Sequence, residues 1–384
     1  MKFFPLFFAG FRRHKLRTTL TLLSVLVAFL LFGYLAAIRN AFSAGVSVAG
    51  ADRLVVRHRV SIIQLLPASY EADIEKIDGV VDAANATWFG GIYREPKNFF
   101  PQMPIDPEEY FALYPEFEIA PAQMEAWKRT RIGAVVGRKT VDRFGWKVGD
   151  RIPIQGTVWQ PKSGGTNWEF ELVGIYDADD PAVDTTGFFF RHDYFDEMRT
   201  FGQGLVGWYL IRVADPARSA AIAQQIDDLF ANSPAETKTE TEGAFVKAFA
   251  DQMGDIGAIV TAILSAVFFT ILLVVGNTIA QGVRERTPEL GVLKAVGFSD
   301  GSVVALVLTE ALALVAVGGA AGLALAWAMV RGGDPTNGAL PSFFLRPVTF
   351  VWGGVFIVLL ALIAAAFPAL TAMRLRPVEA LRRE

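Results

Sequence analysis

Four long apolar stretches alternate with polar segments along the chain and set its organisation. At about 1.5 Å of rise per residue, roughly 20 helical residues cross the hydrocarbon layer of a bilayer. Each stretch reaches this length with few or no charged residues, which predicts four transmembrane helices. The predicted spans are residues 18–38, 256–279, 303–329 and 348–370.

The polar remainder is unevenly distributed. Residues 39–255 form one long segment of soluble composition between the first two spans. The other polar segments are short: an N-terminal segment at 1–17, loops at 280–302 and 330–347, and a tail at 371–384. The first of these interleaves basic and aromatic residues, which is typical of a helix lying on a membrane surface.

Within residues 39–255, one pattern occurs near both ends. A strand-helix-strand order is predicted at 52–60, 67–77 and 79–88, and again at 207–213, 215–231 and 235–241. In the later helix, Ile222, Ile226 and Leu229 are expected to share one face. The repeat predicts an α/β base that is split in sequence, at about 45–92 and 207–250, around an insert at about 93–206.

The insert is predicted to be β-rich. Its predicted strands are residues 132–136, 151–155, 170–175 and 187–191, with a helix near 139–144. Many aromatic residues lie in and beside it, and they either bind an amphiphile or an adaptor protein or form the subdomain's own core. They include Trp88, Phe99, Phe100, Tyr110, Phe111, Tyr114, Phe117 and Trp127. The acidic stretch Asp177–Asp180 lacks the spacing of a calcium loop and is interpreted as a solvated turn.

The composition agrees with a protein that is partly membrane-embedded and partly soluble. Of 384 residues, 52% are hydrophobic and 20% are charged, with a mean hydropathy of +0.36. The net charge of −3 argues against a nucleic-acid partner. There is no cysteine, so thiolate metal sites are excluded, and the three scattered histidines suggest no metal site. We therefore expect no cofactor on this chain.

Basic residues predict the orientation. Lys and Arg number five in residues 1–17, three in 281–301 and four in 374–384, against two in 331–347. The positive-inside rule therefore places both termini and the loop at 280–302 in the cytoplasm. The expected fold class is a membrane α-helical protein of four transmembrane helices, with a large α+β extracytoplasmic domain of two subdomains.

Two polar residues and two glycines stand out within the spans. Asn277 and Glu310 lie in apolar surroundings, where a carboxylate should face protein or water. For Glu310, a structural hydrogen bond within the bundle is favoured over a proton relay. Gly318 and Gly322 form a small-xxx-small pair that permits close helix packing, although glycine is also common in membrane helices generally.

The loop between the second and third spans carries signals for a short helix. Thr287 can cap it, Pro288 suits its first turn, and Glu289 suits the positive end of its dipole. Gly297 is placed to end it, and Ser299 or Asp300 can cap the next helix.

This helix has a predicted apolar face and two open interpretations. Leu290, Leu293 and Val296 recur every three residues and define the face. A short rigid helix rooted between two spans can transmit a push, but it can equally lie passively in the lipid headgroup region.

The segment from Arg284 to Ser299 resembles the signature of FtsX-like permeases. These are the membrane subunits of the MacB and lipoprotein-releasing class of ABC transporters, in which the short helix is a coupling helix that binds a separate cytoplasmic ATPase. The segments Phe144–Asp150, Phe170–Ile175 and Arg374–Glu384 also resemble patterns of this family. The ATPase-coupling residues implied here are Arg284, Arg286, Glu289, Leu290, Gly291, Leu293, Lys294 and Gly297.

The resemblance implies an assembly in the bacterial inner membrane. Two permeases, either two copies of this chain or this chain and a homologue, would bind two ATPase subunits, which hold ATP and Mg. ATPase closure would move the coupling helices and then the periplasmic domains, which is mechanical transmission. The expected outcome is export or extraction of a lipophilic or amphiphilic substrate from membrane lipids or the periplasm, with or without a periplasmic adaptor protein.

Other functions are weighed by what the sequence lacks. No phosphate-binding loop of the Walker type and no nucleophile–base motif occurs, so the chain is not expected to be an enzyme. The main alternative is a non-transporting signalling complex that acts on a cell-wall hydrolase or a sensor partner. An intramembrane enzyme has only Glu310 in its favour.

Overall fold

A computed structural model describes residues 15–48, 50, 52–252, 256–333 and 343–375. The chain divides into two compact units. The helical unit comprises residues 1–40, 255–333 and 343–384, and the α/β domain comprises residues 41–254 and 334–342. Most of the predicted segments 1–17, 330–347 and 371–384 therefore lie outside the described residues.

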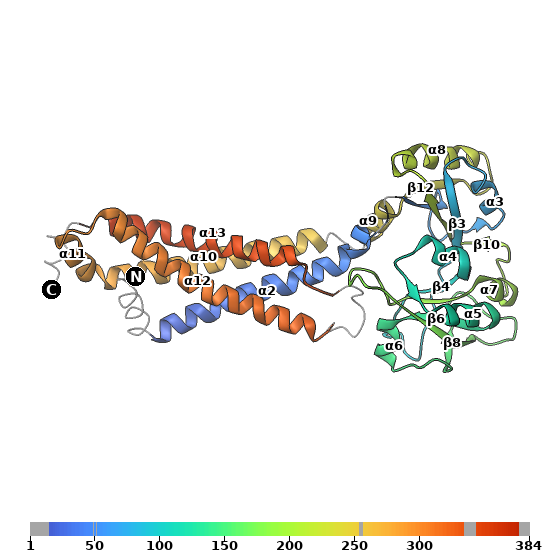
Figure 1. Ribbon diagram of the computed structural model, residues 1–384, viewed down its shortest axis with the longest axis horizontal. Coiled ribbons are helices and arrows are strands. Elements are labelled where there is room, and N and C mark those ends of the chain that lie inside the picture. The colour runs from blue at the N-terminus through green and yellow to red at the C-terminus, as the bar shows by residue number, and fades with distance from the viewer. Residues whose placement is uncertain (1–14, 49, 51, 253–255, 334–342, 376–384) are drawn as a thin grey trace. The chain divides into compact units, whose positions relative to one another are not determined.

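Among its described residues, the helical unit has four long helices and one short helix. The long helices run alongside one another (Figure 1). All four long helices have the length and composition needed to cross a membrane. The helices are α2 (Lys15–Val48), α10 (Ile256–Glu285), α11 (Thr287–Ala295), α12 (Asp300–Arg331) and α13 (Pro347–Met373).

Glycines on α12 allow it to contact the backbone of α2 directly. A Cβ atom on Gly322 would lie 2.3 Å from the carbonyl oxygen of Leu26, and one on Gly318 would lie 2.9 Å from Cβ of Val25. No larger side chain fits at either position without moving α2. Gly318 and Gly322 thus serve close helix packing within the chain itself.

The α/β domain is built on one ten-stranded sheet with the strand order β12-β1-β11-β3-β4-β9-β6-β8-β5, and β7 also pairs with β8. The first four strands pair antiparallel, whereas β4–β9 and β6–β8 are parallel. The strands are β1 (Arg53–His58), β3 (Val80–Ala86), β4 (Gln102–Ile105), β5 (Glu118–Ile119), β6 (Gly133–Gly137), β7 (Arg151–Gln155), β8 (Asn167–Asp177), β9 (Phe188–Arg191), β11 (Trp208–Val213) and β12 (Thr237–Thr241). A separate pair joins β2 (Leu66–Pro67) and β10 (Leu205–Val206).

Helices flank this sheet on the base and on the insert (Figure 1). The base carries α3 (Tyr70–Ile74) and α8 (Ser219–Leu229), and α9 (Glu242–Gln252) follows β12. The insert carries α4 (Pro107–Leu113), α5 (Pro121–Arg129), α6 (Arg138–Phe144) and α7 (His192–Met198).

The base and the insert meet at a narrow junction in the sheet and share part of their apolar core. Between β3 and β4 the ladder is a single pair, Ala86 with Ile105. A shared apolar core extends across this junction, with Val55 and Leu210 from the base and Tyr110 and Phe111 from α4 in one cluster. The insert therefore packs on the base as part of one continuous layer.

One predicted buried face is corrected by the structure. Ile222 and Ile226 are fully buried, but Leu229 is 53% exposed. The helix α8 ends at Leu229, and the next residue, Phe230, turns inward and stacks on Tyr70 with ring centroids 3.8 Å apart. The third core residue of this region is therefore Phe230, because the end of the helix breaks the periodic spacing.

Most aromatic residues of the insert form its core rather than an open surface. Phe100, Tyr110, Phe111, Tyr114 and Trp127 are buried. Trp88 and Phe99, by contrast, are 43% and 52% exposed and stack on each other. Most of the aromatic residues singled out in the sequence therefore belong to the core of the α/β domain.

Candidate functional site

The short helix α11 continues almost directly from α10, and this corrects the predicted cap. Thr287 does not cap α11, since its Oγ1 donates to the carbonyl oxygen of Val283 one turn earlier, at 3.1 Å. Arg286 alone interrupts the helix, and its N–H still donates to the carbonyl oxygen of Gly282 at 3.1 Å. Because the backbone bonding continues through the corner, α11 is held firmly to the end of α10.

The C-terminal end of α11 is formed at Gly297, as the sequence predicts. Gly297 has φ +103°, in the left-handed region that favours glycine. The N–H of Phe298 donates to the carbonyl oxygen of Leu293, and that of Gly297 to Lys294, both at 3.1 Å. These two bonds form a Schellman motif. Ser299 then caps α12 by accepting the N–H of Ser302 at 3.3 Å.

The two faces of α11 differ from the predicted apolar face. Leu290 is only 2% exposed, and Leu293 packs against the same cluster of α10, α12 and α13 residues. Val296, in contrast, is 76% exposed because it stands at the end of the helix, beyond that cluster. Together with Val292, which is 48% exposed, it belongs to an outer stripe. We define the outer stripe of α11 as Pro288, Val292, Ala295 and Val296, all exposed.

One arginine fixes the corner between α10 and α11. The Nη1 of Arg286 lies 2.7 Å from Oε2 of Glu310 on α12, and its Nε lies 3.2 Å from Oε2 of Glu289 on α11. The Arg286 side chain is 17% exposed and that of Glu310 is 31% exposed. The structure thus brings together three of the predicted residues, and it gives Glu310 a partner in the bundle.

A lysine fixes the other end of α11. The Nζ of Lys294 lies 2.7 Å from Oδ1 of Asp300 and donates to the carbonyl oxygens of Met373 and Leu375 at 2.5 and 3.1 Å. Its side chain is 8% exposed. Lys294 therefore ties α11 to the start of α12 and the end of α13, and it places a positive charge on carbonyl groups that α13 leaves open.

The remaining predicted coupling residues divide between the inside and the outside. Gly291 is buried beside Leu290, whereas Arg284 is exposed on the last turn of α10. Next to Arg284, Glu285 pairs with Arg17 of α2 at 2.8 Å. Local sequence patterns do not identify Arg17, Glu285 and Asp300 as partners, because their contacts join residues on different helices.

A family model described as "FtsX-like permease C-terminal" matches residues 260–377, which span α10 to the end of α13. Curated relatives of the MacB and YknZ kind match the chain as well. Residues 260–377 belong to the FtsX-like permease family, and the chain is similar to ABC permeases of the MacB type.

Two relatives and one solved structure illustrate this permease family. The macrolide export ATP-binding/permease protein MacB of Vibrio parahaemolyticus is 28% identical over 193 residues, covering 48% of this chain and 29% of that protein. The uncharacterized ABC transporter permease YknZ of Bacillus subtilis is 34% identical over 140 residues, covering 34% of each chain. The chain thus spans about a third of the length of these relatives. The periplasmic region of MacB from Actinobacillus actinomycetemcomitans matches with a TM-score of 0.38 and 9% identity, covering 53% of this chain and 95% of that one.

The matched segment of this permease also includes the polar residue Asn277. It lies on α10 and is exposed, so the structure does not bring it to Arg286 or Glu310. With four helices of membrane-spanning length and this family membership, the chain is a multi-pass membrane protein.

Proposed function

We propose that this permease is the transmembrane subunit of an ABC transporter and that the outer stripe of α11 is the surface on which a separate ATPase binds. The observation that carries the proposal is the division of α11 into two faces. Its inner face and both ends are tied to the bundle, while Val292 and Val296 are exposed. A partner that displaces this stripe moves a helix that cannot slide independently of the spans.

The contacts at the two ends of α11 determine which other helices move when α11 is displaced. Arg286 connects α11 to Glu310 on α12, and Lys294 connects it to the end of α13. Because the basic side chain of each link is charged and mostly buried, the links favour movement of α11 together with α12 and α13. In this proposal, ATP hydrolysis occurs on the partner, and the permease transmits the movement to its α/β domain.

The orientation and assembly of this proposal follow the distribution of basic residues and the family. Both termini and α11 would lie in the cytoplasm, and the α/β domain would lie in the periplasm. Two ATPase subunits would bind a pair of permeases, either two copies of this chain or this chain and a homologue. An amphiphilic or lipophilic molecule is the substrate class that suits a protein acting at the membrane surface.

The test is co-purification of the ATPase with variants of the outer stripe. In the full chain, Val292→Lys together with Val296→Lys should abolish recovery of the ATPase, because two charges would enter an apolar contact. Glu289 and Leu293 are unsuitable for this test, since both contact the helical unit itself.

Val60→Lys is a matched control, because Val60 is also 76% exposed but lies in the α/β domain. It should leave ATPase recovery unchanged. Full recovery of the ATPase with the double variant would refute the proposed surface. Mass spectrometry of the proteins that co-purify also separates transport from regulation, since a cell-wall hydrolase or sensor in place of an export partner would favour the regulatory alternative.

A further inference from the structure

The chain enters and leaves the α/β domain at adjacent positions. Arg53 is the first residue of β1, which follows α2 in the chain, and Glu242 is the first residue of α9, which precedes α10. The ladder between β1 and β12 ends beside them, with Leu54 paired to Thr241. Both connections to the membrane helices therefore begin at one point of the domain.

At this point, one buried arginine joins three segments. The Nε of Arg53 lies 2.6 Å from Oε2 of Glu242, and its Nη2 lies 2.8 Å from Oε1 of Glu116. Its Nη1 donates to the carbonyl oxygen of Leu113 at the end of α4 at 3.3 Å. The Arg53 side chain is 6% exposed. β1, the start of α9 and the insert thus share one cation.

Tyr114 completes this arrangement. Its hydroxyl donates to Oε1 of Glu242 at 2.7 Å, and its ring lies under the Arg53 guanidinium at 4.5 Å from the centroid. The second oxygen of Glu242 is thereby satisfied, as a buried carboxylate requires. Burial acts to lower the pKa of Arg53, but Glu242, Tyr114 and Glu116 together outweigh it and raise that pKa above its ordinary value, so the arginine stays charged. We define Arg53, Glu242 and Tyr114 as the α9 joint.

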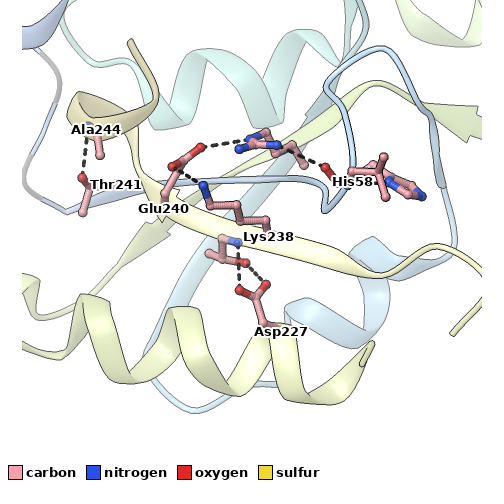
Figure 2. Close-up of polar contacts among 9 residues, drawn as sticks. His58, Asp227, Lys238, Glu240, Thr241 and Ala244 are labelled. Atoms are coloured by element: carbon pink, nitrogen blue, oxygen red, sulfur yellow. Dashed lines mark hydrogen bonds and ion pairs between the residues drawn. The ribbon is translucent and has the colours of Figure 1, made fainter. Parts of the chain in front are cut away.

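A neighbouring ion pair on the same two chain segments lacks this geometry. Arg57 of β1 pairs with Glu240 of β12 at 2.9 Å, with side chains 17% and 15% exposed. Figure 2 shows Glu240 beside Lys238 on β12, and Asp227 of α8 facing the strand from its other side. These contacts hold β12 to β1 and α8, but none of them reaches the insert.

The first turn of α9 has a second attachment. Figure 2 shows the N–H of Ala244 donating to Oγ1 of Thr241, at 3.2 Å. Phe245, one residue further, packs on the core that the base and the insert share. Within its first four residues, the start of α9 is therefore held by an ion pair, a hydrogen bond from a backbone N–H to a side chain, and an apolar contact.

We propose that the α9 joint sets the direction in which α9 leaves the α/β domain, so that α9 and the domain move as one body when a displacement reaches α9. The proposal rests on the proposed function only for the source of the displacement. A joint of buried charges suits this task because loss of the Arg53 guanidinium removes the cation that Glu242 contacts, and intermediate geometries are unfavourable.

The test measures the distance between a label on α9 and a label elsewhere in the α/β domain, because this distance varies when the direction of α9 varies. The chain has no cysteine, so spin labels can be placed at Lys247→Cys on α9 and Asn232→Cys in the α/β domain without background. Both positions are exposed. Pulsed electron paramagnetic resonance on the full chain in nanodiscs should give one narrow distance distribution. Arg53→Met and Glu242→Gln should broaden it, and Tyr114→Phe, which removes one hydrogen bond, should broaden it less.

Arg57→Met and Glu240→Gln are the matched controls, since they remove an ion pair from the same segments without touching α9. They should leave the distribution narrow. An unchanged distribution in Arg53→Met, Glu242→Gln and Tyr114→Phe would overturn the proposal, as would equal broadening in the controls. Tyr114→Phe keeps the test valid if the charge variants fail to fold.

Adding the co-purified ATPase with ATP and Mg separates this inference from the proposed function. A third label in the helical unit, at exposed Leu325→Cys, reports movement of the domain relative to that unit. If ATP does not change the distances measured from Leu325→Cys in the chain with the unmodified joint, the proposed function fails. The distance between Lys247→Cys and Asn232→Cys, measured without ATP, still tests the role of the α9 joint.

Discussion

Each unit of this permease holds one arginine between two glutamates, and the two clusters differ in burial and in sequence separation. In the α/β domain, Arg53 is 6% exposed, and Glu242 lies 189 positions away in the sequence. In the helical unit, Arg286 is 17% exposed, and one of its partners, Glu289, is three positions away. The same residue types therefore meet in a closed site and in a partly open one.

The difference in burial assigns different physical roles to the two clusters. A closed ion pair is costly to break, since the remaining charge has no access to water. A pair with one partner about a third exposed can exchange its contacts for water with a small penalty. The Arg53 cluster suits a permanent joint, whereas the Arg286 cluster suits a weaker link that water can partly share.

The largest expected effect follows from removing the closed cluster. Arg53→Met should destabilise the α/β domain by about 3–5 kcal/mol, the range for breaking a buried ion pair from one side. Denaturant unfolding followed by tryptophan fluorescence measures it, with Arg57→Met as the control of smaller effect. A loss no greater than that of Arg57→Met would show that the two pairs are equivalent and remove the contrast.

The sequence predicted the spans, most strands and the end of α11 at Gly297, because these depend on local periodicity and on a backbone conformation that only glycine adopts easily. It could not predict which carboxylate meets which arginine. Glu289 was assigned to the helix dipole, but it turns to Arg286, whose side chain also reaches α12. The pairing of Arg53 with Glu242 depends on the sheet register, which no local pattern contains.

The helix α4 was missed although its signals are local. Asp106 accepts the N–H groups of Glu108 and Glu109 at 2.9 and 3.2 Å, and Pro107 occupies the first turn. This Asp-Pro-Glu-Glu order is a recognisable helix start. The surrounding Pro-rich and aromatic composition obscured it.

A smaller effect is expected at the partly open cluster. Glu310→Gln should cost about 0.6 kcal/mol of bundle stability, the mean for a side-chain hydrogen bond between membrane helices. Stimulation of the partner ATPase by the permease should fall more than stability does, since the link between α11 and α12 is weakened. Thermal unfolding and ATPase assays on one preparation compare the two. A proportional fall in both would mean that the pair is only structural.

A third cluster, Glu109 with Glu71 and Asp106, consists of carboxyl groups close to one another, in contrast to the two arginine–glutamate clusters. Partial desolvation of the Glu109 carboxyl, with the charges of Asp106 and Glu71, raises the pKa of Glu109 to about 8, although the residue as a whole is exposed. Burial also raises the pKa of Glu71. Folding therefore favours protonated Glu109, and this stabilisation is present below its ordinary pKa of 4.5 and is lost as the pH rises through about 8.

The melting temperature of the α/β domain in the full chain should fall as the pH rises over that interval. Glu109→Gln should flatten this dependence, because the amide does not titrate. Glu108→Gln, which changes the neighbouring exposed carboxylate, is the control and should leave the slope unchanged. An identical slope in Glu109→Gln would place the titration elsewhere.

The smallest effect is expected at the pair between Arg17 and Glu285, whose side chains are 27% and 43% exposed. The guanidinium donates to both carboxylate oxygens, at 2.8 and 2.9 Å, so the geometry is good, but water can replace it. Arg17→Gln should therefore cost only about 0.2 kcal/mol, the low end of the range for exposed ion pairs, and added salt should reduce even that difference. Thermal unfolding at low and high salt measures it. A cost that approached that of Arg53→Met and persisted in high salt would mean that geometry, rather than burial, decides the strength of these pairs, and the assignment of a permanent joint to the α/β domain alone would have to be withdrawn.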